Sequence, residues 1–438
     1  MNQETSDIRN QESCIRQHPE SRNYPVFMKI LVAQLGARMH YAVPEIFYRA
    51  GMLEKLYTDV YVGDKVLMEK ILKPFSGKFP GIARLLSRKS DVIPLDKVVS
   101  FDLLGLWYCW KQQRAKDVYE LSEVFAKGGK AFNLEILKNG FKRVDAIYGF
   151  QSASLELFRY AKTQGVKCIL EQTIAPRKIQ HKLLIEEIER WNGWQPGLKI
   201  ESDKDPLAER EEAEWRVADL ILGGSQFVVD SLQSLGVQFE KCKVVPYGVS
   251  LEKFQVIKKE PLNGRPLRLL FIGEVGLRKG VPYLLEALRM LKSKYIQAKL
   301  LGKNALSKEI VNKYATYADF VGTVPRSEIK SYYDWADVFV LPSICEGSAT
   351  VTYEALASGI PVIATPNTGS VVRNGVDGHI VPIRSSDAIV AILEGYLKTP
   401  GLLQAEQNEA ITGRERLGIE AYGERLIKAI DSCVSQYL

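Results

Sequence analysis

The segment VFVLPSICEGSATVTYEALASGIPVIAT, residues 338–365, constrains the fold of this 438-residue chain more than any other stretch. Its first four residues are apolar and Pro342 follows them, which predicts a buried strand of a parallel sheet. A turn of small polar residues leads into a helix that ends at Gly359, and residues 361–364 form the next strand. Such a unit places its turn at the carboxyl edge of an open sheet, where ligands bind.

Two carboxylates lie in this unit, Glu346 in the turn and Glu354 inside the helix, with seven residues between them. The first turn of a helix has unpaired N–H groups and the positive end of the dipole, which favour an anion by about 0.3–1 kcal/mol when exposed. Gly347, Ser348 and Ala349 are small enough to let a phosphate reach the backbone. Glu354 lies about two turns further on, where it could accept hydrogen bonds from ribose hydroxyls. Taken alone, the two glutamates would be interpreted as a helix cap and an exposed helix residue.

The pattern EGSATVTYEALASGIPV, residues 346–362, resembles the E-x7-E motif of the retaining glycosyltransferases of family 4, which have the GT-B fold. The preceding ADVFVLPS, residues 336–343, fits the same family, and the resemblance extends from about residue 28 to the C-terminus. It implies that Glu346 lies at the donor sugar and that Glu354 binds the nucleotide ribose. It also implies that backbone amides between them hold the diphosphate. Carried over, those amides belong to about Ala349, Thr350 and Val351, and Ser348 is also predicted to bind the donor.

The composition is that of an ordinary globular protein, with 46% hydrophobic and 25% charged residues, long enough for two or three domains. Apolar runs all fall short of the ~18 residues of a transmembrane helix. We expect no signal peptide, since the first 25 residues lack an apolar core. The six cysteines are scattered without a C-x-x-C pair, which indicates reduced thiols in a cytoplasmic protein rather than a zinc site.

Alternating strands and helices predict an α/β protein, with two Rossmann-like domains facing across a cleft. We expect a disordered extension over residues 1–25, an acceptor-side domain over 26–250 and a linker over 251–266. The nucleotide-sugar domain should span 267–419, and a C-terminal helix over 420–438 should cross back onto the first domain, as in the resembled fold. Among the finer expectations are a helix from about Tyr41 to Leu53, a strand over Leu56–Val60, and a helix capped by Ser152 or Ser154.

Two loops are predicted to face the donor. The first follows the first strand and contains Gly36, where a phosphate could approach the backbone, although a simple strand-to-helix turn explains it equally well. In the resembled family this loop faces the donor, which adds Ala37 to the predicted site. The second loop is GEVGLRKG, residues 273–280, which opens with Gly273. Its Arg278 and Lys279 would suit a diphosphate that gains charge as it leaves. A solvated basic loop is the alternative interpretation.

The chain departs from the family pattern in two places. Many members have an arginine directly after the first glycine of the second loop, where this chain has Glu274. The family also often has a functional histidine in the first domain, but the matching segment AIYGFQS, residues 146–152, has none. Tyr148 or Gln151 could face the sugar instead. His40 is another candidate for a sugar contact, and a surface or packing role explains it equally well.

A D-x-D pattern occurs at Asp203-Lys-Asp205, which matches the metal-binding motif of the other major glycosyltransferase fold. Asp205 precedes Pro206 at the expected start of a helix, so we interpret it as a helix N-cap. The sequence therefore predicts no metal site and no cofactor apart from the nucleotide-sugar co-substrate.

These features predict a retaining glycosyltransferase that moves a hexose-type sugar from a nucleotide-diphosphate sugar to a saccharide or lipid-linked saccharide, in polysaccharide or glycolipid synthesis. Glu346 and Lys279 are its expected catalytic residues, and no nucleic-acid partner is expected. The alternatives are a nucleotide-sugar epimerase, a phosphorylase, or a non-catalytic subunit that binds nucleotide sugars. Glu274 and the missing histidine motivate the last alternative, and the intact Glu346, Glu354 and Lys279 weigh against it.

Basic charge is concentrated in one part of the first domain. The whole chain has a net charge of +7, and residues 71–143 contain 14 Lys and Arg against 7 Asp and Glu, which is also +7. Trp107, Tyr108 and Trp110 lie in this segment, and Lys111 and Arg114 follow them. Such residues suit an anionic membrane surface at the inner face of the plasma membrane. Core aromatics and an ordinary solvated face are an equally good explanation.

Overall fold

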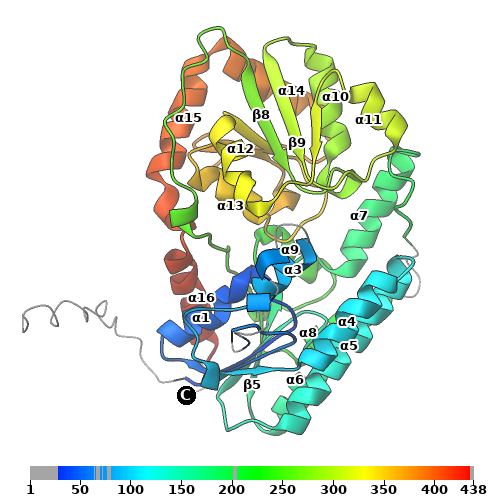
Figure 1. Cartoon of the computed structure of the whole chain (residues 1–438), viewed down its shortest axis with the longest axis vertical. Coiled ribbons are helices and arrows are strands. Elements are labelled where there is room, and N and C mark those ends of the chain that lie inside the picture. Colours follow the sequence, from blue (N-terminus) through cyan, green and yellow to red (C-terminus); the bar gives the residue numbers. More distant parts are fainter. Residues whose placement is uncertain are drawn as a thin grey trace, which may run out of the picture.

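The computed structural model describes residues 28–63, 65, 70–71, 73–75, 80–200 and 205–434. It contains two α/β domains stacked along the long axis of the molecule, as Figure 1 shows. The expected extension over residues 1–25 lies outside the described residues, as do the last four residues of the chain. None of the described helices is long and apolar enough to cross a membrane.

The first domain is built on a parallel sheet, with seven strands among the described residues in the order β3-β2-β1-β4-β5-β6-β7. Its central strands are buried throughout or almost throughout, which is why they are continuous apolar runs in the sequence. The strands are β1 (Ile30–Gln34), β2 (Leu53–Thr58), β3 (Val98–Ser100), β4 (Ala146–Phe150), β5 (Lys167–Gln172), β6 (Leu220–Gly223) and β7 (Cys242–Val244).

Helices pack around this sheet (Figure 1). They are α1 (Ala42–Arg49), α3 (Pro80–Leu86), α4 (Asp102–Arg114), α5 (Val118–Asn139), α6 (Leu155–Thr163), α7 (Arg177–Arg190), α8 (Pro206–Val217) and α9 (Gln226–Ser234). The helix expected from Tyr41 to Leu53 is shorter, because Gly51 takes a left-handed φ of 71° that ends it. As a result β2 begins at Leu53, earlier than the expected Leu56.

The predicted serine cap of α6 is wrong in its chemistry. Ser154 occupies the N-cap position, but its hydroxyl donates to the carbonyl of Phe150. The carboxylate of Glu214, from α8, instead accepts the amides of Ser154 and Leu155 at 2.8 and 3.1 Å. A partner 60 residues away therefore satisfies this helix end.

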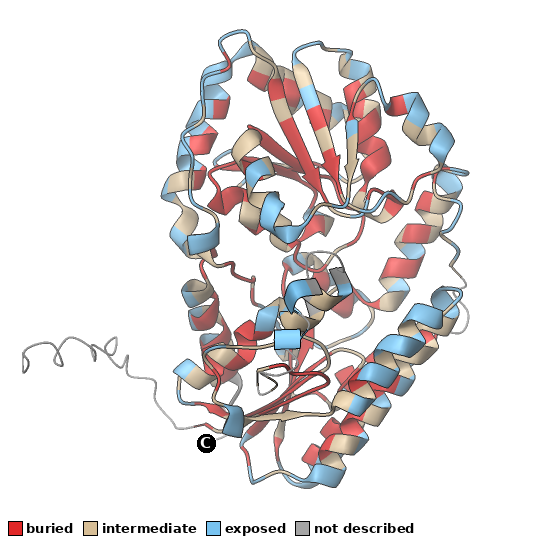
Figure 2. Cartoon of the chain, in the orientation of Figure 1, coloured by how far each residue is buried: buried red, intermediate tan, exposed pale blue. Residues whose placement is uncertain are grey.

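The second domain repeats the arrangement with six parallel strands in the described part of the chain, ordered β10-β9-β8-β11-β12-β13. These are β8 (Leu267–Ile272), β9 (Ile296–Leu301), β10 (Asp319–Gly322), β11 (Val338–Leu341), β12 (Val362–Ala364) and β13 (Gly378–Ile380). Its helices are α10 (Val281–Leu291), α11 (Lys308–Tyr314), α12 (Ile329–Trp335), α13 (Thr350–Ala357), α14 (Ser386–Lys398) and α15 (Pro400–Thr412). The predicted strand–turn–helix–strand unit is thus present as β11, α13 and β12. In Figure 2 the buried residues are concentrated on the two sheets and the helix faces that cover them.

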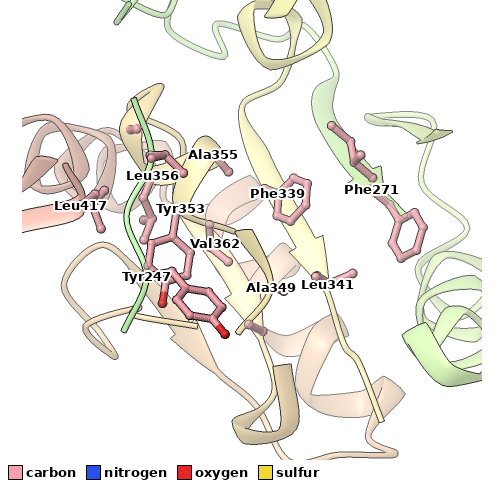
Figure 3. Packing of buried hydrophobic residues seen from close by; sticks show 14 of the residues in the cluster. Tyr247, Phe271, Phe339, Leu341, Ala349, Tyr353, Ala355, Leu356, Val362 and Leu417 are labelled. Atoms are coloured by element: carbon pink, nitrogen blue, oxygen red, sulfur yellow. The ribbon is translucent and has the colours of Figure 1, made fainter. Parts of the chain in front are cut away.

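The C-terminal helix α16 (Ile419–Val434) crosses back to the first domain, as predicted, and packs against α1. Beside it, Val249 pairs with Gly418 where the chain passes between the domains. The ring of Tyr247 lies 5.8 Å from that of Tyr422 on α16. Figure 3 shows Tyr247 next to Tyr353 of α13, so aromatic packing joins the interdomain connection to the helix that carries Glu354.

Candidate functional site

Loops from the carboxyl ends of both sheets meet between the domains. The amide of Ala175, just after β5, donates to the carbonyl of Glu346 at 3.4 Å. A Cβ on Gly347 would lie 1.8 Å from the carbonyl oxygen of Thr173, so this close approach of the two domains requires glycine. The guanidinium of Arg38, in the loop after β1, donates to the Thr173 hydroxyl at 2.9 Å. The loops after β1 and β5 therefore meet the turn that contains Glu346 at this interdomain edge.

Arg278, Lys279 and Glu346 form a charged cluster at this edge. The Lys279 ammonium lies 2.6 Å from Oε1 of Glu346, and the Arg278 guanidinium contacts the same oxygen. The side chains of Lys279 and Glu346 are each only 12% exposed. Burial lowers the pKa of Lys279, the positive charge of Arg278 lowers it further, and Glu346 opposes both. Two cations thus converge on one partly buried carboxylate, where a bound diphosphate could compete for them.

The glycines of the second donor loop explain its shape. Gly273 has a φ of 154°, and a Cβ there would lie 3.4 Å from Cε of Lys279, so the lysine stem runs along the loop backbone. Gly280 has a φ of 67°, and a Cβ would lie 1.8 Å from the carbonyl oxygen of Pro342. The amide of Ile344 donates to the carbonyl of Arg278 at 2.9 Å. These contacts fix the one-turn 3-10 helix Leu277–Lys279 against the turn that contains Glu346.

Glu354 lies on α13 with its carboxylate largely buried. Oε2 accepts the hydroxyl of Tyr333 at 2.9 Å, whereas Oε1 lies 4.0 Å from the Arg326 guanidinium. Burial raises the pKa of Glu354, and Tyr333 and Arg326 oppose that shift. Within the described part of the chain, one carboxylate oxygen is therefore held by Tyr333, while the contact of the other is the Arg326 guanidinium at 4.0 Å.

The start of α13 offers fewer amides than the sequence predicts. The amide of Ala349 donates to the carbonyl of Thr368 at 3.2 Å, so it is already used in this structure. Ser348 also turns inward, because its hydroxyl pairs with that of Tyr353 at 2.6 Å. Thr350 and Val351 are the first two helical residues, whose amides have no intrahelical acceptor. The predicted diphosphate amides are thereby reduced to these two.

In the first domain, the loop after β1 has an unusual backbone. Gly36 has a φ of 91°, and, its two chain neighbours aside, no described residue comes within 4 Å of the Cβ it lacks, which is compatible with a ligand at this point. Its amide donates to Asp59 at 3.0 Å. Met39, His40 and Tyr41 all have positive φ angles of 46–65°, a conformation that costs energy in non-glycine residues. Ala37 lies between these features, partly exposed.

His40 is exposed and faces the second domain. Partial desolvation lowers its pKa, and the positive charges of Arg326 and Lys253 lower it further. Arg326 is also the cation that lies 4.0 Å from Oε1 of Glu354, the predicted ribose ligand. The pKa shift favours its neutral form, which can both donate and accept hydrogen bonds.

Neither Tyr148 nor Gln151 replaces the missing histidine in this structure. Tyr148 is fully buried, and its hydroxyl donates to Glu171. The side-chain oxygen of Gln151 accepts the amides of Thr173 and Ile174, at 2.6 and 3.3 Å. Gln151 therefore supports the loop that contacts Glu346. The sequence prediction did not include Thr173 and Arg38. Thr173 directly follows β5, and Arg38 lies four residues after the end of β1, in the predicted Gly36 loop.

Asp205 is the N-cap of α8, as expected, and accepts the Leu207 amide at 2.9 Å. Arg177 and His181 of α7 also contact its carboxylate, at 2.8 and 3.2 Å. The remainder of the D-x-D pattern lies outside the described residues. Among the residues that the structure does describe, no group of three or more His, Cys, Asp or Glu side chains is placed to hold a metal ion. Glu274 is exposed, and its negative charge is near enough to Lys279 to oppose the lowering of the pKa of that lysine.

The comparisons with known proteins agree with this geometry. Residues 266–399 match the model of a protein family. That family is described as glycosyl transferases group 1. Sequence relatives include the amylovoran biosynthesis glycosyltransferase AmsK of Erwinia amylovora, which is 30% identical over 190 residues, 40% of this chain and 46% of that protein. Another is the alpha-monoglucosyldiacylglycerol synthase of Streptococcus pneumoniae, 28% identical over 232 residues, 48% of this chain and 51% of that protein. The chain thus spans about half the length of these relatives.

Solved structures extend the likeness to both domains. Anabaena HepE, solved in complex with UDP, superimposes with a TM-score of 0.57 at 15% identity over 92% of this chain and 100% of that one. Sucrose-phosphate synthase from Thermosynechococcus elongatus gives a TM-score of 0.59 at 15% identity over 93% of this chain and 100% of that one. These likenesses confirm the predicted GT-B fold, with two Rossmann-like domains.

Proposed function

We propose that this protein is a retaining glycosyltransferase that transfers a hexose from a nucleotide-diphosphate sugar to a saccharide or lipid-linked saccharide, in polysaccharide or glycolipid synthesis. The observation that carries the proposal is the convergence of Arg278 and Lys279 on Glu346 beside the start of α13. Two cations and the amides of the first two helical residues suit a diphosphate, and Glu354 lies about one turn into the same helix for the ribose. The match of residues 266–399 to group 1 glycosyl transferases supports the same assignment.

In this mechanism the donor diphosphate replaces Glu346 as the ion-pair partner of Arg278 and Lys279. The freed carboxylate then accepts hydrogen bonds from the hydroxyls of the transferred sugar. The bond between C1 and the diphosphate oxygen breaks, and the acceptor oxygen bonds to C1 from the same face. The acceptor proton passes to the departing phosphate oxygen, while Lys279 and Arg278 stabilise its growing charge.

Donor binding is tested by thermal shift with a panel of nucleoside diphosphates and their sugars. A ligand at about 100 times its dissociation constant stabilises the folded state by about 2.7 kcal/mol, which the assay resolves easily. Lys279→Met should abolish the shift, whereas Lys303→Met, a change at an exposed position on the same domain, should leave it intact. If no nucleoside diphosphate or nucleotide sugar stabilises the wild-type protein, the proposal fails.

We further propose that the protein binds its acceptor at an anionic membrane surface. The exposed face of α4 supports this proposal. Its Leu103, Leu106, Trp107 and Trp110 are 84, 57, 38 and 46% exposed, and their spacing places them on one face of the helix. The Arg114 guanidinium lies 4.4 Å from the Trp110 ring centre. An exposed apolar face flanked by cations suits the interface of an anionic leaflet.

One of the three aromatic residues expected on this surface, Tyr108, is not part of it. Tyr108 packs against Phe125 of α5, with ring centres 6.2 Å apart, so it belongs to the α4–α5 interface. A Cβ on Gly128 of α5 would lie 2.3 Å from the Tyr108 ring, which shows how closely the two helices pack. Leu103 and Leu106 take its place on the exposed face.

Sedimentation with vesicles of phosphatidylglycerol or phosphatidylcholine tests the membrane proposal. Wild-type protein should sediment with the anionic vesicles at low salt, and Trp107→Ser with Trp110→Ser should weaken this at least tenfold. Leu402→Ser, at an exposed leucine of α15, is the matched control. Equal recovery in the supernatant with both vesicles, or binding unchanged by reversing the charges of Lys111, Arg114 and Lys116, would exclude it.

A further inference from the structure

Helix α7 belongs to the first domain but reaches the second domain. Figure 1 shows it rising beside the second sheet, across the molecule from α16. At its N-terminal end, Arg177 pairs with Asp205 of the first domain at 2.8 Å. Near its C-terminal end, Glu187 pairs with Arg384 of the second domain at 2.5 Å. Both ends of this helix are therefore tied down, each to a different domain.

Beyond α7, two tryptophans anchor the chain to the second domain. The indole N–H of Trp191 donates to the hydroxyl of Tyr283 at 3.0 Å, and that hydroxyl donates to Glu187 at 2.7 Å. Trp194 is only 8% exposed, and its ring centre lies 5.4 Å from that of Tyr314. Such a buried aromatic contact, with its polar groups paired, is a firm attachment.

Gln195 directly follows Trp194 and contacts the second donor loop, residues 273–280. Its side-chain oxygen accepts the amide of Leu277 at 2.8 Å. Leu277 begins the 3-10 turn that carries Arg278 and Lys279. Gly276 makes room for the contact, because a Cβ there would lie 2.6 Å from the same oxygen of Gln195.

We propose that Gln195 is a positioning residue for the diphosphate: the first domain, through α7, sets the start of the turn that carries Arg278 and Lys279. The proposal deepens the proposed function and rests on it, because it assumes that these two cations bind a diphosphate. Gln195 does not itself touch the donor. It acts by fixing the backbone from which both cations project, so that docking of α7 and donor affinity are coupled.

The test compares two ligands of the same nucleoside. From a panel of uridine, guanosine, adenosine, cytidine and thymidine diphosphates, the tightest binder and its monophosphate are titrated calorimetrically. Removing one neutral hydrogen bond changes affinity by about 3- to 10-fold. Gln195→Ala should weaken the diphosphate by that factor and leave the monophosphate within twofold, while Gln164→Ala, an exposed glutamine of the same domain, should change neither.

Gly276→Ala supplies an independent perturbation of the same contact. Its backbone is extended, with φ −164°, so alanine fits the chain and only displaces Gln195. It should reproduce the selective loss, and adding it to Gln195→Ala should weaken binding no further. Equal losses for both ligands, no loss in Gln195→Ala, or additive losses in the double variant would overturn the positioning role. Failure of every diphosphate to bind the wild type would instead overturn the proposed function.

Discussion

Replacing Glu354 by glutamine should weaken nucleotide binding through the ribose alone. The oxygen of Glu354 bound by Tyr333 can be retained by the amide, and the Tyr333 hydroxyl also lies 3.2 Å from the carbonyl of Val351, so the fold has a second acceptor. Hydrogen bonds to a charged group contribute about 1.5–3 kcal/mol, against about 0.5–1.5 kcal/mol for neutral pairs. Losing the charge therefore costs about 1–1.5 kcal/mol per bond.

Two ribose hydroxyls would double this cost to about 2–3 kcal/mol, which is about 30- to 150-fold in dissociation constant. Calorimetry with a nucleoside diphosphate and its 2′-deoxy form measures this directly. Wild-type protein should discriminate strongly between the two ligands, and Glu354→Gln should discriminate much less. Glu394→Gln, on the exposed face of α14, is the matched control. Equal affinity of the folded variant and the wild type for the ribonucleotide would refute the assignment of Glu354.

Three further outcomes are expected. Glu346→Ala should lower turnover more than it lowers affinity for the bare nucleoside diphosphate, because the carboxylate is expected to contact the sugar once the diphosphate binds the two cations. Steady-state kinetics measures the turnover, and calorimetry measures the affinity. Lost nucleotide binding with full turnover at saturation would contradict this prediction. Activity should survive EDTA, because cationic side chains take the role of a metal; loss with EDTA and rescue by Mg²⁺ or Mn²⁺ would overturn this. Burial raises the pKa of Asp205, but His181, Arg177 and the Leu207 amide together lower it well below the usual value. The ionised Asp205 carboxylate therefore stabilises the folded state fully above about pH 4, and this contribution is lost as the pH falls. Asp205→Asn should therefore cost about 3 kcal/mol of unfolding free energy at pH 7, and this difference should shrink on acidification in denaturant titrations.

Local sequence predicted the parts of the site that local structure determines. The β11–α13–β12 unit follows from one apolar run, one small turn and a glycine stop. The loop from Gly273 to Gly280 follows from glycines that the close contacts with Lys279 and Pro342 require. The strand–turn–helix pattern and the approach of Gly273 to Lys279 depend on near neighbours, so they are visible in the chain, whereas the contact of Gly280 with Pro342 is not.

Contacts between segments that are distant in the sequence could not be predicted from local sequence patterns. Glu214 caps α6 from 60 residues away, and Thr368 takes the amide of Ala349 from another loop. The contact between Gln195 and Leu277 joins residues 82 positions apart. Tyr108 could not be assigned to the interior of the α4–α5 pair, because that depends on which face of α4 meets Gly128.

The anomeric configuration of the first product tests the central claim most directly. Purified protein is incubated with the nucleotide sugar that binds most tightly, with water or a lipid-linked saccharide as acceptor. Proton NMR then follows the first-formed product before its anomers equilibrate. The account predicts release of the nucleoside diphosphate, a product that keeps the donor configuration at C1, and loss of both in Glu346→Ala. An inverted product, or release that Glu346→Ala leaves unchanged, would contradict it.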